Sequence, residues 1–308
     1  MKAILLAGGK GTRLRPLTIH TPKPIVPIFN RPFLHYQIDL LKQVPEIDEV
    51  ILSLNYQPRR IEEIFGDGSE LGITIRYVVE PAPLGTAGAI KYAGDQLRES
   101  VVVFNGDVLT FLEKPNADEI TCDTINAGIY ILEPDTFDRI PSNVAWSIER
   151  SYFPSLIERR ETFVGYVYNG YWIDIGTPGK YTQVHRDIMD RRYAAEPFRE
   201  ASAPRAFVAS DAKIEDGATV EGPCFIDEGV LVKAGAKIGP YSVIGRQTQI
   251  EEEAVVSGAV IWPNCRISRE ACVRDAILGR HCHIGRNVSV NSGAVLGDKT
   301  TLTDYTKA

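Results

Sequence analysis

Two spacings of apolar residues divide the chain. Up to residue 196, short apolar runs alternate with stretches in which apolar residues recur every three to four positions. From residue 207 onward they recur every six residues instead. The first pattern predicts strands alternating with helices, and the second predicts a stack of short strands. We therefore expect two domains, 1–196 and 207–308, joined by the Pro- and Ala-rich linker 197–206.

The first domain opens with the expected order strand, helix, strand, helix, strand. Such alternation is typical of an α/β fold with a mostly parallel sheet, in which ligands bind beyond the carboxyl ends of the strands. Strands are expected at 2–7, 49–54, 73–79, 101–107, 124–132 and 162–168. Helices are expected at 32–44, 57–66, 86–93, 147–160 and 178–192.

The first strand runs into a loop rich in glycine. Gly8, Gly9 and Gly11 carry no side chain that would keep a ligand from the backbone N–H groups, which is the geometry that phosphate binding uses. The loop and the Pro-rich bend after it add the cationic side chains Arg13, Arg15 and Lys23. Such groups can neutralise several phosphate oxygens at once. The stretch therefore indicates a phosphate-binding loop.

Two better-known phosphate loops do not fit this stretch. The P-loop would need Gly-Lys-Ser/Thr, and the dinucleotide loop would need a small residue where the chain has Leu14. The longer string GGKGTRLRPLT…TPKPIVPI, residues 8–28, resembles the signature of the sugar-1-phosphate nucleotidyltransferases, or nucleotide-sugar pyrophosphorylases. The resemblance implies a Rossmann-like nucleotidyltransferase domain that transfers a nucleotidyl group from an NTP to a sugar 1-phosphate and releases pyrophosphate.

A second motif bears on the choice of nucleotide. EPAPLGTAGAIKYA, residues 80–93, matches the nucleotide-base pocket of the family, and LGTAGA is most like its branch that uses GTP and mannose 1-phosphate. The resemblance therefore implies GTP and mannose 1-phosphate as substrates. A glucose-1-phosphate enzyme using UTP or dTTP would differ only in the base and sugar pockets. A non-catalytic regulatory subunit of such an enzyme is a further alternative.

Two carboxylates are candidate metal ligands. Asp107 ends the buried run VVVFNGD, and Asp174 lies in GYWIDIGTP. A hard Mg²⁺ ion prefers carboxylate oxygens and is commonly bridged to phosphate. The resemblance implies that Asp107 and Asp174 are the family's metal ligands, with Mg²⁺ as cofactor. On its own, an Asp at a strand end is more often a turn residue or a helix cap.

The resemblance also implies the remaining site residues. Arg13 would neutralise the leaving pyrophosphate, and Lys23 would hold phosphate near the reacting centre. Nucleotide contacts are expected from Leu6, Ala7, Gly8, Gly9, Gly11, Thr12, Arg13, Glu80, Gly85, Thr86 and Asp107. Sugar-phosphate contacts are expected from Glu113, Lys114, Asn126 and Gly128.

The chain between these motifs is unexpectedly short. Only three residues separate Asp107 from FLEKP, residues 111–115. In the family, FLEKP belongs to a separate strand, and a helix and further strands intervene. A connection between parallel strands needs about a dozen residues or more. We therefore expect that Thr110 and Phe111 are not neighbours in the intact protein, with a true deletion as the alternative.

Charge and cysteine content restrict the partners. A formal charge of −6 argues against nucleic acid or an anionic membrane as the main partner. The apolar run at 3–7 is too short for a signal peptide or a membrane span, so we expect a cytoplasmic protein. Five cysteines without a C-x-x-C pair favour buried, reduced thiols.

The six-residue spacing runs from Ile214 to Leu302, with one-residue slips before Ile261 and Leu278. It is typical of a hexapeptide β-helix with three faces per coil. The domain resembles the left-handed parallel β-helices that the family often carries behind its catalytic domain. An acyltransferase of this type would need a His in a cleft, and the repeat offers His281 and His283 on ordinary coil positions. We favour a structural or assembly role, and expect a homo-oligomer.

Overall fold

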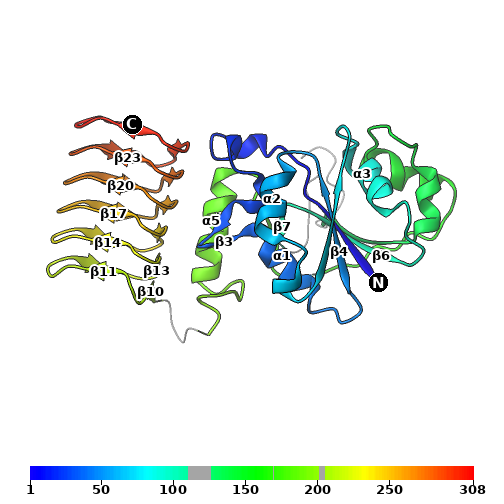
Figure 1. Ribbon diagram of the computed structural model, residues 1–308, viewed down its shortest axis with the longest axis horizontal. Coiled ribbons are helices and arrows are strands. Elements are labelled where there is room, and N and C mark those ends of the chain that lie inside the picture. Colours follow the sequence, from blue (N-terminus) through cyan, green and yellow to red (C-terminus); the bar gives the residue numbers. More distant parts are fainter. Residues whose placement is uncertain (110–125, 169, 201–204) are drawn as a thin grey trace. The chain divides into compact units, whose positions relative to one another are not determined.

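The computed structural model describes residues 1–109, 126–168, 170–200 and 205–308. These residues form two compact units (Figure 1). The first contains residues 1–10, 22–25 and 33–174, and the second contains residues 11–21, 26–32 and 175–308. Two short N-terminal segments therefore group with the repeat and not with the sheet. Glu113, Lys114 and Cys122 lie outside the described residues.

The first unit is built on a five-stranded sheet with the order β5-β4-β1-β6-β8. The strands are β1 (Lys2–Leu6), β4 (Glu49–Leu54), β5 (Thr74–Val79), β6 (Val101–Asn105) and β8 (Ile129–Leu132). The first four in the chain are parallel, and β8 runs antiparallel to β6. This confirms the mostly parallel sheet, and it places β1 between β4 and β6.

Helices cover both faces of this sheet. They are α1 (Phe33–Leu41), α2 (Pro58–Phe65), α3 (Gly85–Gly94) and α4 (Phe153–Glu158), the last preceded by the π-helical turn η7 (Ile148–Tyr152). Leu5 of β1 belongs to the apolar cluster that includes residues of α1 and α2, whereas its neighbour Ile4 belongs to the cluster that includes residues of α3 and α4. Successive side chains of a strand point to opposite faces, so one strand supplies both cores.

Shorter elements complete the first unit. They are the 3₁₀ turns η3 (Lys23–Ile25), η4 (Ser69–Leu71) and η6 (Pro134–Arg139), and the paired strands β7 (Val108–Leu109) and β9 (Ile173–Asp174). The expected helix at 147–160 starts as predicted, because the Ser147 hydroxyl accepts a hydrogen bond from the backbone N–H of Arg150 at 3.2 Å.

The strand expected at 162–168 is wrong. Residues 161–168 form neither helix nor strand, and Val164 and Tyr166 are 81% and 85% exposed. Alternation and β-branched residues favour an extended chain, but a strand forms only where a neighbouring strand supplies the ladder of hydrogen bonds. The strand expected at 124–132 is also shorter than predicted, since β8 begins at Ile129.

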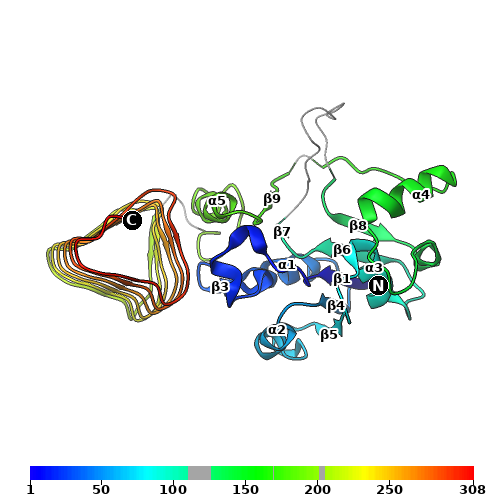
Figure 2. The same cartoon turned by 90° about the horizontal axis from the view of Figure 1, so that it is seen from above.

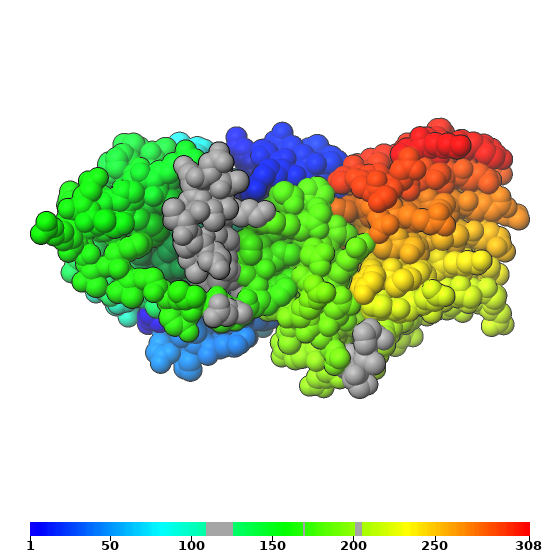
Figure 3. Space-filling model, turned by 180° about the vertical axis from the view of Figure 1, so that it is seen from behind, coloured from blue at the N-terminus to red at the C-terminus, as the bar shows by residue number. Residues whose placement is uncertain are grey.

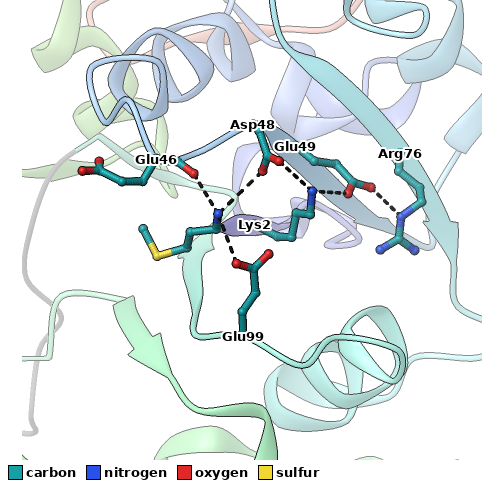
Figure 4. Close-up of polar contacts among 7 residues, drawn as sticks. Lys2, Glu46, Asp48, Glu49, Arg76 and Glu99 are labelled. Carbon is teal, nitrogen blue, oxygen red and sulfur yellow. Dashed lines mark hydrogen bonds and ion pairs between the residues drawn. The ribbon is translucent and has the colours of Figure 1, made fainter.

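Opposite charges are paired at the amino ends of β1, β4 and β5 (Figure 4). Lys2 Nζ lies 3.0 Å from Asp48 and 3.3 Å from Glu49, and Arg76 Nε lies 2.7 Å from Glu49. Burial opposes ionisation of Glu49, but hydrogen bonds from Arg76 and Lys2 outweigh it and hold the pKa of this carboxyl below its ordinary value. The charges at this end of the sheet are thus satisfied within the chain.

The second unit contains the repeat, which forms three parallel sheets of six, six and five short strands. The first sheet holds β10 (Ala206–Val208), β13 (Cys224–Ile226), β16 (Val243–Ile244), β19 (Val260–Ile261), β22 (Ile277–Leu278) and β25 (Val295–Leu296). The second holds β11 (Lys213–Ile214), β14 (Leu231–Val232), β17 (Gln249–Ile250), β20 (Arg266–Ile267), β23 (His283–Ile284) and β26 (Thr301–Leu302). The third holds β12 (Thr219–Val220), β15 (Lys237–Ile238), β18 (Val255–Ser257), β21 (Cys272–Arg274) and β24 (Ser289–Val290).

The strands wind as successive coils around three faces, as Figure 2 shows along the stack and Figure 3 shows as bands from yellow to red. This confirms the β-helix of hexapeptide repeats. Phe225 pairs with Val243, and Val243 in turn pairs with Val260. The coil that begins at Val243 is therefore one residue shorter than the coil that begins at Phe225. The slip before Ile261 is therefore a shorter corner, and the stacking continues through it.

The interior of the β-helix is a column of apolar side chains. Ile226, Ile244, Ile261 and Leu278 occupy equivalent positions in successive coils and are at most 1% exposed. The corners hold left-handed residues, many of which are not glycine, such as Gln247 with a φ of 59°. Such a conformation costs about 1 kcal/mol. Hydrogen bonds between coils offset this cost.

The second unit also holds three N-terminal elements and one long helix. These are η1 (Thr12–Leu14), η2 (Leu17–Ile19), the hairpin of β2 (Pro27–Ile28) and β3 (Arg31–Pro32), and α5 (Pro178–Met189). The four described cysteines, Cys224, Cys265, Cys272 and Cys282, are free, as expected. Among the described residues, no helix has the length and apolar character that crossing a membrane requires.

Candidate active site

The glycine loop starts at the carboxyl end of β1. Ala7 extends the strand, because its N–H donates to Ser53 O at 2.9 Å. A Cβ at Gly8 would lie 3.1 Å from Asn55 N and 3.2 Å from Glu80 Oε1, so a larger residue would need its neighbours to shift. A Cβ at Gly9 would meet nothing within 4 Å. The loop therefore turns tightly at Gly8 and opens at Gly9.

Asp107 lies beside this loop. Leu6 pairs with Asn105, and the N–H of Gly106 donates to Leu6 O at 3.0 Å. A Cβ at Gly106 would lie 2.4 Å from that same oxygen, so only glycine allows this approach. Asp107 follows directly, at the edge where β1 and β6 both end.

Lys23 pairs with Asp107. Its Nζ lies 2.7 Å from Oδ2, and the two side chains are 10% and 31% exposed. The lysine comes from η3 and the aspartate from the end of β6, so residues far apart in sequence meet as a partly buried pair of opposite charges. Such a pair can open to bind a phosphate at the ammonium and a cation at the carboxylate.

Asp174 pairs with Val108, the residue that follows Asp107, in the ladder between β7 and β9. The backbones of Asp107 and Asp174 are therefore one ladder position apart. The parts of the chain that the structure describes contain no group of three or more potential metal-ligating side chains. Mg²⁺ typically binds through one or two carboxylates together with substrate phosphates. This pair fits that donor set.

Gln37 was missed by the sequence analysis. It lies on α1 with no exposed surface, and its Nε2 donates to Asn105 O at 2.9 Å and to Val108 O at 2.7 Å. These bonds clamp the chain on both sides of Asp107. The sequence did indicate a buried, hydrogen-bonded role for Gln37. This residue falls on the apolar face of a predicted helix, where an amide without hydrogen-bond partners would destabilise the fold.

Glu80 shapes the loop that leads into α3. It is 8% exposed, and one carboxylate oxygen accepts from Ser53 Oγ and the other from Leu84 N, both at 3.0 Å. The predicted nucleotide residue therefore joins β4 to the start of the base-pocket motif.

The two glycines of LGTAGA lie against the chain's own backbone. A Cβ at Gly85 would lie 2.8 Å from Trp146 O, and one at Gly88 would lie 2.7 Å from Val144 O. The hydroxyl of Thr86 accepts from Ile148 N at 2.8 Å. The close approach at these positions is made by the backbone of the chain itself.

The predicted sugar-binding residues that are described lie beside the end of β6. Gly128 N donates to Asn126 Oδ1 at 3.0 Å, and Gly128 O accepts from Asn105 N at 2.8 Å. A Cβ at Gly128 would lie 2.4 Å from Asn105 Nδ2. Asn126 and Gly128 are therefore brought next to the strand end that carries Asp107.

The rest of the signature, from Gly11 to Thr21, belongs to the second unit. Gly11 adopts a left-handed φ of 58°, and its carbonyl accepts from Thr18 Oγ1 at 2.6 Å. Thr12 and Arg13 follow in η1 with exposed side chains. The segment is thus folded on itself and presents its cations to solvent.

These features define an α/β protein whose parallel sheet carries, at the carboxyl ends of its strands, a glycine-rich loop and a Lys23–Asp107 ion pair. Residues 2–110 and 101–191 match the family described as nucleotidyl transferase, and residues 220–307 match the GMPPB C-terminal domain. The chain belongs to the nucleotidyl transferase family, and it is a nucleotidyltransferase by this membership.

Individual relatives are similar over most of the chain. Mannose-1-phosphate guanylyltransferase of Mycobacterium tuberculosis is 34% identical over 305 residues, covering 84% of this chain and 82% of the relative. UTP–glucose-1-phosphate uridylyltransferase of Synechocystis is 30% identical over 327 residues, covering 86% and 84%. A solved Bacillus anthracis structure, assigned as a glucose-1-phosphate thymidylyltransferase, has a TM-score of 0.52 and 20% identity over 60% of this chain and 94% of that chain. The last likeness supports the fold alone.

Proposed function

We propose that this protein transfers the guanylyl group of GTP to mannose 1-phosphate, giving GDP-mannose and pyrophosphate. The observation that carries the chemistry is the Lys23–Asp107 pair at the strand edge where the glycine loop begins, with Asp174 paired to the next residue, Val108. The choice of GTP and mannose 1-phosphate is supported by LGTAGA and by the name of the Mycobacterium tuberculosis relative.

The reaction is an in-line displacement. A phosphate oxygen of the sugar 1-phosphate attacks the α-phosphorus, a new P–O bond forms, and the bond to the bridging oxygen of pyrophosphate breaks. The protein has little covalent chemistry to do, so positioning and charge neutralisation dominate. A bound Mg²⁺ would supply positive charge to the phosphate oxygens.

The chain's own residues take complementary roles in this proposal. Asp107 and Asp174 would hold the Mg²⁺, Lys23 would hold phosphate near the reacting centre, and Arg13 would neutralise the pyrophosphate. The backbone from Leu6 to Thr12 approaches the nucleotide, and Glu80 orders the loop before Gly85 and Thr86. Asn126 and Gly128, with Glu113 and Lys114, recognise the sugar phosphate.

We also propose that the chain lacks a segment of its family's catalytic domain between Thr110 and Phe111. The family matches it in two pieces, 2–110 and 101–191, which overlap just before this point. The exposed apolar residues Val164 and Tyr166 support the same idea, since a missing strand would leave apolar surface uncovered. An intact mass above 34.1 kDa would show that the natural protein carries more residues, whereas a mass equal to it would establish a deletion.

Two further proposals concern the setting of the enzyme. We propose a cytoplasmic protein, because the four described cysteines are free and three of them are buried, as a reducing compartment allows. We also propose a homo-oligomer formed through the β-helix, whose long faces suit a symmetric contact. Light scattering of the full chain would distinguish this oligomer from a monomer.

The experiment that tests the function is pyrophosphate release with Mg²⁺, crossing GTP, ATP, UTP and dTTP against mannose 1-phosphate and glucose 1-phosphate. Release with GTP and mannose 1-phosphate alone is the expected result. Release with UTP or dTTP and glucose 1-phosphate would favour the alternative that the Synechocystis relative represents. If protein of verified mass released no pyrophosphate with any substrate pair, the result would favour a regulatory subunit.

A further inference from the structure

The β-helix holds the segment that carries the signature arginines. Arg280 lies between β22 and β23, and its Nη1 donates to Thr21 Oγ1 at 2.6 Å. Thr21 is 1% exposed and ends the segment 11–21, which contains Arg13 and Arg15. A charge-assisted hydrogen bond to a buried hydroxyl is a strong constraint on the backbone that bears it.

Arg280 is itself held from two sides. Its guanidinium carbon lies 4.8 Å from the centre of the Trp262 ring, and its backbone N–H donates to Asp298 Oδ1 at 2.8 Å. Trp262 is 1% exposed, so the ring that stacks on the guanidinium is fixed in the wall of the β-helix. A stacked guanidinium loses little further freedom when it forms a hydrogen bond.

The same tryptophan reaches the second signature segment. Trp262 Nε1 donates to Tyr181 Oη at 2.9 Å, and Tyr181 Oη donates to Pro27 O at 2.6 Å. Tyr181 belongs to α5 and Pro27 to β2. Residues 11–21 and 26–32 are thus tied to one region of the β-helix through Arg280 and Trp262.

A close packing contact lies near this anchor. A Cβ at Gly297 would lie only 3.1 Å from Pro16 Cβ, so a coil approaches the middle of segment 11–21 closely. Pro16 follows Arg15 directly in the chain. The segment is therefore fixed beside its arginines at Pro16 and at its end at Thr21.

We propose that Arg280 is a positioning residue for nucleotide binding, through which the β-helix holds segment 11–21 in the conformation that presents Arg13 and Arg15 to the NTP phosphates. The inference rests on the proposed nucleotidyl transfer. Arginines that are already oriented bind phosphate without the cost of ordering the loop. Lysine at position 280 could donate to Thr21, but it would lack the flat guanidinium that stacks on Trp262.

The kinetic test compares Arg280→Ala, Arg280→Lys and Thr21→Val in the full chain. We expect Arg280→Ala to raise the KM for the NTP about tenfold, with a much smaller change in the KM for the sugar 1-phosphate. Arg280→Lys should recover part of the loss. Arg280→Ala combined with Thr21→Val should add little to the single change, because both remove one interaction.

Arg286→Ala is the matched control. Arg286 also lies on the β-helix, and it pairs with Asp304, with Nε 3.0 Å from Oδ2. It has the same charge and follows its strand β23 at the same spacing as Arg280 follows β22, so it reports the effect of removing an arginine from the repeat. We expect its KM values to equal those of the wild type. An equal rise in both arginine variants would overturn the proposal.

Hydrogen exchange gives a readout that does not need activity. The N–H groups of Leu14 and Arg15 donate to Gly11 O at 3.0 Å and to Thr12 O at 3.2 Å, so they report the order of η1. Their exchange should accelerate about tenfold in Arg280→Ala and stay unchanged in Arg286→Ala, while the amides of β1 keep wild-type rates. Unchanged exchange at Leu14 and Arg15 would overturn the positioning role. If the wild-type protein turned over none of the substrate pairs, the proposed nucleotidyl transfer would be refuted, but the positioning role of Arg280 would not.

Discussion

The two β structures of this chain use their residues in opposite ways. The sheet of the first unit joins strands from distant parts of the sequence, so unlike groups such as Gly8, Lys23 and Asp107 meet at one edge. The β-helix stacks each coil on its neighbour, so like residues meet, as Ile226, Ile244 and Ile261 do. The sheet therefore concentrates chemically different residues at one place, whereas the repeat distributes its stabilising contacts along the whole stack.

The largest effect on turnover is expected from Asp107→Asn, at the edge of the sheet where β1 and β6 end. The amide keeps the shape of the side chain but removes the charge that pairs with Lys23 and would bind a cation, so kcat should fall by about 10³-fold. Pyrophosphate release measures this, and urea unfolding checks that the fold is intact. Asp48→Asn is the control at the other end of the sheet, and it should leave turnover unchanged. Full turnover in Asp107→Asn would remove this carboxylate from the mechanism.

Ile267→Ala tests whether apolar side chains buried inside the β-helix stabilise it. Ile267 has no exposed surface, so its truncation should cost about 3 kcal/mol of unfolding free energy. Ile214→Ala makes the same change at the equivalent phase of the repeat, but Ile214 is 38% exposed, and the cost there should stay below about 1 kcal/mol. Chemical denaturation of both variants measures the difference. Equal costs would contradict burial in the interior as the source of the repeat's stability.

Gln37→Met tests the two hydrogen bonds by which Gln37 holds the backbone on both sides of Asp107. Methionine fills a similar volume but leaves the carbonyls of Asn105 and Val108 without their donor, so stability should fall by about 2 kcal/mol. The KM for Mg²⁺ should rise as well, because Asp107 lies between those carbonyls. Gln43→Met, at an exposed position just beyond the same helix, should change neither quantity. A stability loss with an unchanged KM for Mg²⁺ would limit Gln37 to a role in folding.

His185 should make the second unit sensitive to acid. Burial lowers its pKa from 6.5 to about 4, and the neutral ring accepts from Phe29 N at 3.2 Å while its Nδ1 contacts Tyr181 O at 2.8 Å. The unfolded chain binds the proton at higher pH than the folded chain, so stability is present above about pH 6.5 and is lost as the pH falls toward 4. The loss between pH 7 and pH 5 should be about 2 kcal/mol.

Urea unfolding at several pH values measures this loss. His185→Gln removes the titrating group, so the difference between pH 7 and pH 5 should shrink. His20→Gln, at an exposed position, should keep the wild-type pH dependence. The same slope in all three proteins would show that other groups cause the acid sensitivity.

Predictions from the sequence were most accurate for elements that depend only on nearby residues. The spacing of six gave the strands of the repeat and both slips, because each coil depends on its neighbour alone. β4 was predicted residue by residue at 49–54, and α2 ends before Gly66, which has a φ of 51°. The segment 162–168 shows the limit, because its alternation is real but a strand also needs a partner.

The two kinds of β architecture, the glycine loop and the residue types of the site follow from the amino-acid sequence. Which of these residues meet follows from folding: Lys23 pairs with Asp107, Gln37 donates to the backbone on both sides of Asp107, and Arg280 donates to Thr21. Folding also gives Gly85 a packing role against Trp146. The physical reason is that periodicity and turn preference act over a few residues, whereas ion pairs, buried amides and close backbone contacts depend on chain segments that only folding brings together.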